Sequence, residues 1–534
     1  MHVVVIGSGI AGATCAESLA VAWRNQPEHR ITLLSASPML KTVANFHQLS
    51  RTLETFEIVE RWLDDALQYP NLSIVHATVA SVDTRAKSVL DTAGRRHAYD
   101  KLCVCAGARP NLIATAHPEH VIGIRDTESV KDLQARLGSA RRVVVVGNGG
   151  IALELVHEVQ FCDVVWAVRD EHIGTSFFDA GAATFFMSDV KLESAGMSEN
   201  ESTATLRHGL PEEPEETENG VAIFTPHTLQ QRAAKAALAS ARAGVSDIPS
   251  SQAPPEPNQT APAMEVYSGA ALGPRWQDQA RLHPIGERID TPRRVVELST
   301  SVSAVLSPAE FVAYRQQHPA IVHNDTDILD WPAIVVLSNN RVYGCDVVVS
   351  ATGVVPCADF IGPEILRASD GGIAVNDQMQ TNLPDVFAAG DVCTVQWPTS
   401  SHWFQLRLWT QARQMGAYAA RCIQAAAKHE LALLDFCFEA FAHVTRFFGF
   451  KVVLLGLYNA QGLAVGDYEV LLRVTRGHEY IKLVLANGCV QGAVLIGETD
   501  LEETFENLIL NQLDVSAFKD MLLDPDVDVE DYFD

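Results

Sequence analysis

Short runs of apolar residues recur along the chain without alternating with polar positions. Such runs are typical of strands that are buried on both faces of a parallel sheet. The strands that they predict lie at residues 3–6, 101–105, 141–146, 163–168, 294–298, 333–337, 347–349 and 386–389.

Helical periodicity directly follows two of these strands. Residues 11–24 and 151–160 each begin just after a glycine-rich turn, and each is followed by a further strand, at residues 30–34 and 163–168. Strand, helix and strand at this spacing predict a parallel sheet with right-handed crossovers. Another helical pattern spans residues 406–426.

From about residue 431 the pattern changes to strands joined by tight turns, at residues 451–458, 468–474 and 481–485. Asn487 and Gly488 predict a type I′ hairpin turn. Thr499 and Glu502 predict a capping box at the start of a helix over residues 501–512. This region is therefore expected to form an α+β domain.

A polar, proline-rich stretch at about residues 190–272 interrupts the second strand–helix unit. It contains an acidic run at residues 212–218 and a Ser/Pro-rich run at 250–257, and too few apolar residues to offset the entropy of ordering the chain. We expect a largely disordered insertion, in which a single helical pattern spans residues 229–243.

Composition narrows the classes of function. The 534 residues are 47% hydrophobic, enough for several cores, and carry a formal net charge of −26, which disfavours direct binding to nucleic acid. No apolar run is long enough for a membrane helix, and a strand begins almost at Met1, so an intracellular protein without a membrane anchor is expected. The ten cysteines are scattered, without zinc-site spacing, and indicate reduced thiols and no metal.

The first glycine-rich turn follows the first strand. In such a turn the first glycine permits the bend, the second lets a pyrophosphate approach the backbone, and the third packs the helix on the strand. The expected cofactor-binding residues are Gly7, Gly9, Ile10, Ala11 and Gly12. The second strand ends at Ser35, where an acid usually binds the ribose, so Ser35 is a single neutral candidate for that contact.

A second turn of the same kind follows the strand at residues 141–146. Its expected cofactor-binding residues are Gly147, Asn148, Gly149, Gly150 and Ile151. The next strand ends before Arg169 and Asp170, which suit a 2′-phosphate and a 2′-hydroxyl respectively, so NADH and NADPH both stay open; Arg169 could equally be a surface charge. Glu154 lies one turn into the helix and either orients the nicotinamide or forms a structural ion pair.

Gly390 and Asp391 complete the pattern after the strand at residues 386–389. Asp391 is a plausible acceptor for a ribityl hydroxyl of a flavin, and the alternative is an ordinary helix cap. Two dinucleotide turns in this order, with a late Gly-Asp pair, indicate two dinucleotides in one molecule. That arrangement suits hydride transfer from a nicotinamide to a flavin.

The predicted fold class is therefore α/β, with two Rossmann-like dinucleotide-binding domains and a C-terminal α+β domain. The FAD-binding domain is discontinuous and comprises residues 1–140 and 345–430. The NAD(P)-binding domain, residues 141–344, is inserted into it and carries the disordered insertion. Residues 431–534 form the α+β domain.

Together these motifs resemble the pyridine nucleotide-disulfide oxidoreductase family. Ala106, Gly107 and the nearby Arg109, and the turn that ends in Gly353, stand where that family has its two Ala-Thr-Gly turns, which implies that they contact cofactor. The most specific segments span residues 147–155, 408–416 and 496–512. The resemblance implies FAD and NAD(P)H as cofactors and a location in nucleus and cytoplasm. It also implies a protein partner, the tRNA-splicing ligase complex, whose oxidation-sensitive thiol the protein protects.

The redox-active dithiol of that family is missing. No cysteine lies between Cys15 and Cys103, and Cys103 and Cys105 share a strand face with β-carbons about 7 Å apart, too far for an unstrained disulfide. Cys393 could be a lone thiol near the flavin, although core packing is the simpler interpretation. Lys41 lies where related enzymes approach the flavin ring.

The sequence therefore favours an FAD-dependent NAD(P)H oxidoreductase whose electrons leave to an external acceptor. Lys41, Glu154 and Cys393 are the candidate catalytic residues. One alternative is a reductase of a small electron-transfer or disulfide-containing protein. Another is a nucleotide-loaded binding protein that shields its partner and turns over slowly.

Overall fold

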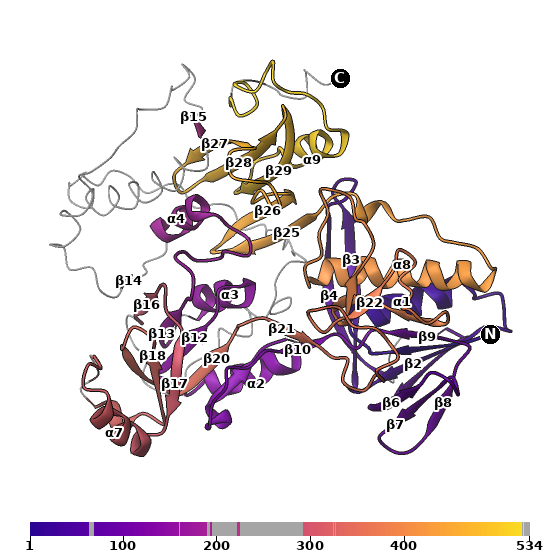
Figure 1. Cartoon of the computed structure of the whole chain (residues 1–534), viewed down its shortest axis with the longest axis horizontal. Coiled ribbons are helices and arrows are strands. Elements are labelled where there is room, and N and C mark those ends of the chain that lie inside the picture. Colours follow the sequence, from indigo (N-terminus) through magenta and orange to yellow (C-terminus); the bar gives the residue numbers. More distant parts are fainter. Residues whose placement is uncertain are drawn as a thin grey trace, which may run out of the picture.

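The computed structural model shows three sheet-based units, which occupy the right, the lower left and the top of Figure 1. Much of the predicted insertion, including its helix at residues 229–243, lies outside the residues that the structure describes. The described residues are 1–63, 69–125, 127–159, 161–189, 193–194, 222–224, 292–323, 325, 327–525 and 527.

The first unit is built on a parallel sheet in the order β23-β9-β1-β2-β5. Helices α1 and α8 pack against each other, and Gly416 of α8 permits this because a Cβ there would overlap the carbonyl oxygen of Ala11. The bounds are β1 His2–Ile6, β2 Arg30–Ser35, β5 Leu72–His76, β9 Lys101–Val104, β23 Val386–Ala388, α1 Ile10–Ala22 and α8 Trp409–Ala427.

Smaller sheets surround this unit. The long hairpin β3–β4 passes close to α1, and β6 to β8 form a meander at the outer end. The bounds are β3 Met39–Gln48, β4 Glu54–Trp62, β6 Val79–Asp83, β7 Ser88–Asp91, β8 Arg96–Ala98, β22 Ile373–Val375 and β24 Cys393–Val395. Strands β10 Ala108–Pro110 and β21 Val354–Pro356 pair antiparallel and link the first unit to the second.

The second unit has a parallel sheet in the order β11-β20-β12-β13-β16-β14. Strand β11 lies before residue 140 and β20 lies after residue 345, yet both belong to this sheet. The domain boundaries predicted at residues 140 and 345 were therefore wrong, and the strands of the unit run from Val121 to Ser350. The bounds are β11 Val121–Gly123, β12 Arg142–Val146, β13 Asp163–Ala167, β14 Glu193–Ser194, β16 Arg294–Glu297, β20 Val347–Ser350, α2 Thr127–Leu137, α3 Gly150–Glu158 and α4 Ala180–Asp189.

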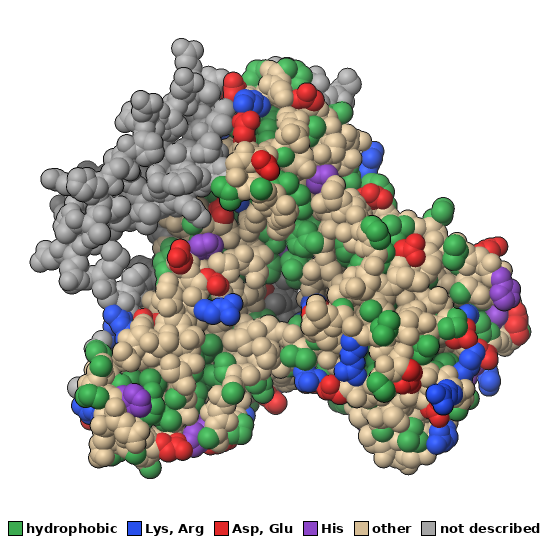
Figure 2. All heavy atoms as spheres, viewed as in Figure 1, with side chains coloured by type: hydrophobic (Ala, Val, Ile, Leu, Met, Phe, Trp, Pro, Cys, Tyr) green, Lys and Arg blue, Asp and Glu red, His purple; other side chains and the backbone are tan. Residues whose placement is uncertain are grey.

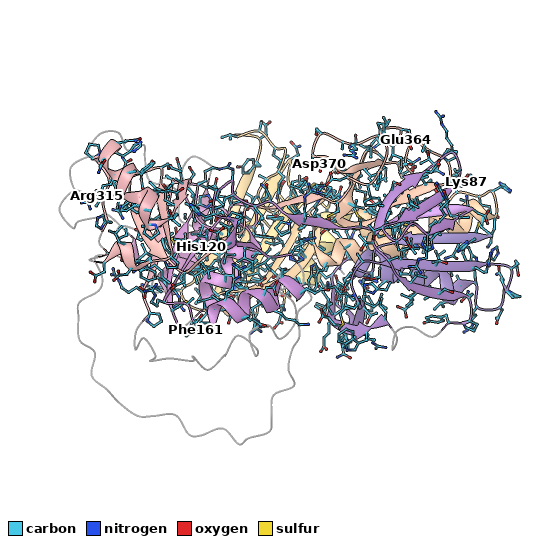
Figure 3. The ribbon with its side chains drawn as sticks, turned by 90° about the horizontal axis from the view of Figure 1, so that it is seen from below. Lys87, His120, Phe161, Arg315, Glu364 and Asp370 are labelled. Carbon is cyan, nitrogen blue, oxygen red and sulfur yellow. The ribbon has the colours of Figure 1, made fainter. Side chains whose placement is uncertain are left out.

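An antiparallel meander and helix α7 close the outer face of the second unit. The bounds are β17 Val302–Leu306, β18 Ala333–Leu337, β19 Val342–Cys345 and α7 Pro308–Gln317. Viewed from below, Arg315 of α7 and Lys87 of the β6–β7 turn lie towards opposite ends of the long axis, which places the two dinucleotide folds side by side along it (Figure 3).

The third unit is an antiparallel sheet in the order β15-β27-β28-β29-β26-β25, with α9 packed on it. The hairpin turn is confirmed, since Asn487 and Gly488 have φ angles of 52° and 76°. The capping box is wrong: Leu501 is the N-cap of α9, and the Thr499 hydroxyl contacts the Glu502 carboxylate at 3.3 Å. The bounds are β15 Ala222–Phe224, β25 Ala442–Phe447, β26 Phe450–Gly456, β27 Glu469–Thr475, β28 Glu479–Ala486, β29 Cys489–Ile496 and α9 Glu502–Asn511.

The third unit packs against both dinucleotide folds. Buried Glu506 of α9 accepts a hydrogen bond from the backbone of Thr52 at 2.7 Å in the β3–β4 turn, and buried Lys482 donates to Asp179 at 2.6 Å just before α4. Aromatic side chains fill the contact with the second unit: Phe177, Phe178, Phe185, Phe186, Phe447, Phe448, Phe450 and Tyr480. The space-filling view shows a notch in the lower edge of the molecule, between the two dinucleotide folds (Figure 2).

Candidate active site

The first glycine turn joins β1 to α1 and has a shape that only glycine permits at two positions. Gly7 has a φ of +106°, and a Cβ there would overlap the carbonyl oxygen of Cys105. A Cβ on Gly12 would overlap the carbonyl oxygen of Gly7. At Gly9, in contrast, a Cβ would meet no atom of the described residues within 4 Å other than those of its chain neighbours. The turn is therefore tight on its protein side and open above Gly9, as a backbone that receives a pyrophosphate must be.

The second turn, between β12 and α3, repeats this geometry. Gly147 has a φ of +131°, and a Cβ there would overlap the carbonyl oxygen of Ala351. Gly149 is as open as Gly9, with no atom within 4 Å of a Cβ. Fully buried Ala152 takes the place of Gly12. Two turns of the same shape thus face open space at the ends of two parallel sheets.

The helices that begin at these turns have no capping side chain at their positive ends among the residues that the structure describes. Neither α1, capped by Gly9, nor α3, capped by Gly149, has a side-chain cap or an acidic residue in its first turn. The same holds for α8, where the buried hydroxyl of Thr410 has no hydrogen-bond partner among the described residues. Helix α7, far from these turns, has a full capping box from Ser307 and Glu310. Helix N-termini without a side-chain cap fit phosphates and the polar edge of a flavin.

Asp391 lies beside the first turn, in a single 3-10 turn that follows β23. Its carboxylate is 6% exposed and forms an ion pair with Arg125, which precedes α2. Arg407 donates to the backbone oxygen of Asp391 at 2.9 Å and to Asp370, labelled in Figure 3, at 2.6 Å. Gly390 packs against Ala11 of α1. Asp391 is therefore fixed between α1 and α8, where it can accept a hydrogen bond from a cofactor hydroxyl.

Lys41 reaches the same region from β3. Its backbone N–H donates to the carbonyl of Ser8 at 3.1 Å, which attaches β3 to the first turn. Its ammonium group forms an ion pair with Glu128 of α2 at 2.8 Å, and Ser37 donates to the other oxygen of Glu128 at 2.5 Å. Burial raises the pKa of Glu128, but the bonds from Lys41 and Ser37 outweigh it and lower the pKa to about 2. The sequence did not indicate Glu128 or Arg125, because each forms its ion pair with a residue of the other dinucleotide fold, far away in the chain.

The Lys41→Met variant should lose stability in a pH-dependent manner. The folded-state pKa of Glu128 lies below its ordinary value of about 4.3, so the pair stabilises the fold above that pH and loses its contribution as the pH falls through about 2. Because the Glu128 side chain is 40% exposed, we expect a loss below about 1 kcal/mol at pH 7. Urea unfolding at pH 7 and pH 3 should show a smaller difference from wild type at pH 3. An equal difference at both pH values would contradict the ion-pair explanation.

Ser35 ends β2 beside the first turn, but its side chain faces inward. It is fully buried, and its hydroxyl contacts the Ser8 hydroxyl at 2.6 Å and the Ser37 carbonyl at 2.5 Å. These bonds hold the turn against the end of β2. Ser35 therefore supports the glycine turn from its protein side. A direct contact of Ser35 with the ribose stays a prediction.

Asn148 fastens the second turn to the loop after β13. Its amide nitrogen donates to Asp170 at 2.8 Å, to the His172 carbonyl at 2.9 Å and to Thr175 at 3.1 Å, while its oxygen accepts from the Gly174 N–H at 2.5 Å. The bond from Asn148 lowers the pKa of Asp170. Asn148 and Asp170 therefore form a structural pair. The side chain of Asn148 binds the loop, and its backbone belongs to the glycine turn.

The Asn148→Ala variant should be less stable and bind NAD(P)H more weakly, while its FAD content stays unchanged. The substitution removes one acceptor and a shared donor from a partly buried network, which costs about 1–3 kcal/mol of the free energy of unfolding. The loop that fixes the second turn would then be loose. Chemical denaturation and a fluorescence titration with NADH measure the two effects. A variant that loses FAD and keeps NADH affinity would contradict the assignment of the two turns.

The remaining predicted residues divide into buried and exposed groups. Glu154 is buried on α3, and Arg169 is exposed beyond β13. Fully buried Cys393 donates to the carbonyl of Gly390 at 3.3 Å, and burial raises the pKa of its thiol, which favours a packing role. Arg109 forms an exposed ion pair with Asp359 at 2.7 Å. The other predicted positions lie in or beside the turns: Ile10 starts α1, Gly150 and Ile151 are the first two residues of α3, Ala106 and Gly107 follow β9, and Gly353 follows β20.

All ten cysteines are free thiols. Three of them cluster below the first turn, with Cys103 Sγ 3.6 Å from Cys105 Sγ and 3.8 Å from Cys15 Sγ. Hydrogen bonds from the neighbouring thiols and burial raise the pKa of Cys103 well above its ordinary value. These sulfurs are packed as core thiols, on the far side of the turn from Gly9.

The residues that the structure describes include neither a membrane-spanning helix nor a metal site. No helix among them is long and apolar enough to cross a bilayer. No three of their His, Cys, Asp or Glu side chains come together as a metal site would require. A groove of about 640 Å³ between α1, α8 and the β3–β4 hairpin is lined by none of the predicted site residues.

The fold and the paired turns define a class of protein, the oxidoreductases that hold two dinucleotides at the ends of two Rossmann-like sheets. The chain belongs to the pyridine nucleotide-disulphide oxidoreductase family, whose sequence profile matches residues 1–193 and 314–416. This is a family of FAD-containing, NAD(P)H-dependent oxidoreductases, and FAD and NAD(P)H are the cofactors that the two turns fit.

Known proteins resemble the chain along its whole length. It is 44% identical to the rat protein called pyridine nucleotide-disulfide oxidoreductase domain-containing protein 1 and 43% identical to the human one, each over 99% of this chain and 98% or 97% of the relative. The water-forming NADH oxidase of Lactobacillus brevis, solved with NADH, shares the fold with a TM-score of 0.57 at 15% identity, over 99% of this chain and 95% of its own.

Proposed function

We propose that this protein is an FAD-dependent NAD(P)H oxidoreductase that works without an internal dithiol. The observation that carries the proposal is the pair of matching glycine turns, each open at its second glycine and each followed by a helix without a cap. FAD, when bound, supplies a two-electron acceptor for the hydride of the nicotinamide. The chain itself contributes binding, orientation and electrostatics.

The described residues support distinct parts of this task. The N-termini of α1 and α3 bind the two pyrophosphates, and Asp391 accepts a hydrogen bond from a hydroxyl of the flavin chain. Lys41, held by Glu128, provides a fixed positive charge near the first turn. The N-terminus of α8, with the unpartnered hydroxyl of Thr410, provides donors for negative charge at the flavin edge.

The scattered cysteines support the absence of the family's dithiol. All ten thiols are free, and the sequence has no cysteine between Cys15 and Cys103, where the Cys-x4-Cys pair would lie. Electrons must then leave to an acceptor outside the chain, such as oxygen, a quinone or another protein. A reductase of an electron-transfer or disulfide-containing protein is the second candidate, since an external acceptor is common to both functions.

We also propose a protein partner, the tRNA-splicing ligase complex, whose oxidation-sensitive thiol this protein protects in the nucleus and the cytoplasm. The specific segments at residues 147–155, 408–416 and 496–512 support this by resemblance. The net charge of −26 favours contact through protein over direct contact with RNA.

An anaerobic titration tests the proposed activity. Purified protein should be yellow, and one equivalent of NADH or NADPH should bleach the flavin band completely. Admission of air should restore it rapidly for an oxidase, or only after addition of an acceptor protein for a reductase. A long-lived charge-transfer band in air would favour the shielding alternative, and uptake of a second equivalent would show that a disulfide participates. A colourless protein that never binds flavin would refute the proposal.

A further inference from the structure

Strand β25 carries a buried histidine, His443, whose Nδ1 has no hydrogen-bond partner among the residues that the structure describes. His443 is 3% exposed, and none of the described residues donates to or accepts from its Nδ1. A buried polar atom that stays unpaired costs about 1–3 kcal/mol, so most such atoms in native proteins pair with a protein group, an ordered water or a bound molecule. His443 is therefore a candidate for contact with a molecule that the chain binds.

Aromatic rings connect His443 to the second glycine turn. The ring of Phe177 stacks on that of His443 with a centroid distance of 6.5 Å. On its other side Phe177 contacts the turn, because its Cε2 would lie 3.5 Å from a Cβ placed on Gly150. Phe447, two pleats along β25 on the same face as His443, would lie 3.7 Å from that Cβ. His443 thus lies one ring beyond the start of α3.

The opposite side of His443 faces the segment that leads to α8. The ring of Phe441 lies 6.5 Å from His443 and stacks on Phe404 at 4.4 Å, with an angle of 9° between the planes. The carbonyl of Phe404 accepts a hydrogen bond from Gln411, in the first turn of α8, at 3.0 Å. These rings therefore connect His443 both to the start of α3, at the second glycine turn, and to the start of α8, which lies near Gly390 and Asp391. The nicotinamide and the flavin are expected to meet between these two helix starts.

The imidazole has the hydrogen-bonding capacity that a nicotinamide needs. Burial lowers the pKa of His443 to about 4, so the ring is neutral near pH 7, with one donor and one acceptor nitrogen. The carboxamide of nicotinamide likewise offers an N–H donor and a carbonyl acceptor. A neutral ring also avoids charge repulsion with the positive ring of oxidised nicotinamide.

We infer that His443 is a positioning residue whose Nδ1 accepts a hydrogen bond from the carboxamide N–H of the nicotinamide ring. This inference rests on the proposed binding of NAD(P)H at the second turn. It assigns a specificity role to the C-terminal sheet, which supplies a polar contact to a site otherwise built from the two dinucleotide folds.

The His443→Phe variant of the full chain tests this role. Phenylalanine keeps the ring and removes the unpaired nitrogen, so the melting temperature without nucleotide should be equal to or above that of wild type. The Kd for NADH, measured by fluorescence titration of the FAD-loaded protein, should rise about 10-fold. The flavin content and its absorbance should stay unchanged.

A nucleotide analogue separates this contact from a structural effect. Reduced 3-acetylpyridine adenine dinucleotide keeps the carbonyl and lacks the amide N–H groups. Wild type should bind it about 10-fold more weakly than NADH, and His443→Phe should bind the two nucleotides alike. The His443→Asn variant, which places an amide where Nδ1 lies, should recover part of the discrimination.

His402→Phe is the matched control. His402 is also buried, but its Nε2 is paired with Gln491 at 2.9 Å, so this variant should lower the melting temperature and keep the wild-type discrimination. The inference would be overturned if wild type and His443→Phe showed the same ratio of Kd values for the analogue and NADH. It would also be overturned if His443→Phe lost stability and kept the wild-type Kd for NADH. Failure of wild type itself to bind NADH would overturn both the inference and the proposed function, and it would be seen before any variant is compared.

Discussion

The Gly9→Val variant is expected to fold normally and to purify without flavin. Gly9 has a φ of −68° and a ψ of 178°, an extended conformation that valine adopts readily. Apart from Gly9 itself and its chain neighbours, no atom of the described residues lies within 4 Å of the position of its Cβ, so the fold accepts the larger residue. The side chain would instead fill the space that the pyrophosphate of FAD needs to approach the turn.

We expect the affinity for FAD to fall by about 100-fold or more, which corresponds to ~2.8 kcal/mol. Oxidised flavin absorbs at ~450 nm, so the ratio of absorbance at ~450 nm to that at ~280 nm in the purified protein measures retained flavin. Thermal unfolding after FAD has been removed from both proteins measures the stability of the fold. Gly12→Ala is the contrasting variant, because a Cβ there would overlap the Gly7 carbonyl oxygen and should destabilise the fold itself. A stable, fully yellow Gly9→Val protein would show that FAD binds elsewhere.

The turns could be predicted from the sequence because their constraints are local. A run of apolar residues followed by Gly7, Gly9 and Gly12 specifies a strand, a tight turn and a helix within a short stretch, and the structure has β1 and α1 there. The second unit follows the same rule with β12 and α3. Helix α8 is also confirmed, although it begins at Trp409, three residues later than predicted.

The domain boundaries could not be predicted in the same way. Strand β20 pairs with β12 and not with β9, and β11 pairs with β20; both pairings depend on contacts between residues far apart in the chain. An apolar run has the same appearance in either sheet. The ion pairs of Lys41 with Glu128 and of Asp391 with Arg125 are non-local for the same reason. The sequence named one partner of each pair and gave no signal for the other.

The error at Thr499 has a local cause. A capping box would make Thr499 the N-cap and Glu502 the third helical residue. Asp500 instead adopts a φ of 52°, Leu501 becomes the N-cap, and Glu502 is the first residue of the helix, which starts two positions later than the capping box requires. Glu502 instead forms an ion pair with Lys451 of β26 at 2.9 Å. The Glu502 carboxylate thus binds a lysine of another strand and does not cap the backbone of its own helix.

The absence of caps on α1, α3 and α8 connects the fold to the proposed chemistry. A helix in which neither a capping side chain nor an acidic first-turn residue balances the positive end is less stable by itself, since a cap contributes about 1 kcal/mol. An anionic cofactor restores that balance at each turn. The two dinucleotides are therefore expected to stabilise the fold as well as to serve the reaction, and their effects should be separable by turn.

The Gly149→Val variant is expected to stay yellow and to resist reduction by NADH and NADPH. Gly149 has a φ of −95° and open space around its Cβ position, so valine fits the fold there as it does at Gly9. Its side chain would exclude the nicotinamide dinucleotide from the second turn and leave the first turn untouched. We expect the Kd for NAD(P)H to rise by about 100-fold or more, and the FAD content to equal that of wild type.

Chemical reduction provides the control for this variant. Dithionite needs no nucleotide site, so it should bleach the flavin of Gly149→Val as fully as that of wild type, whereas NADH should bleach only wild type within the same time. Gly9→Val and Gly149→Val together then assign one dinucleotide to each turn. Rapid reduction of Gly149→Val by NADH would contradict this assignment, because the hydride would have to arrive from a site other than the N-terminus of α3.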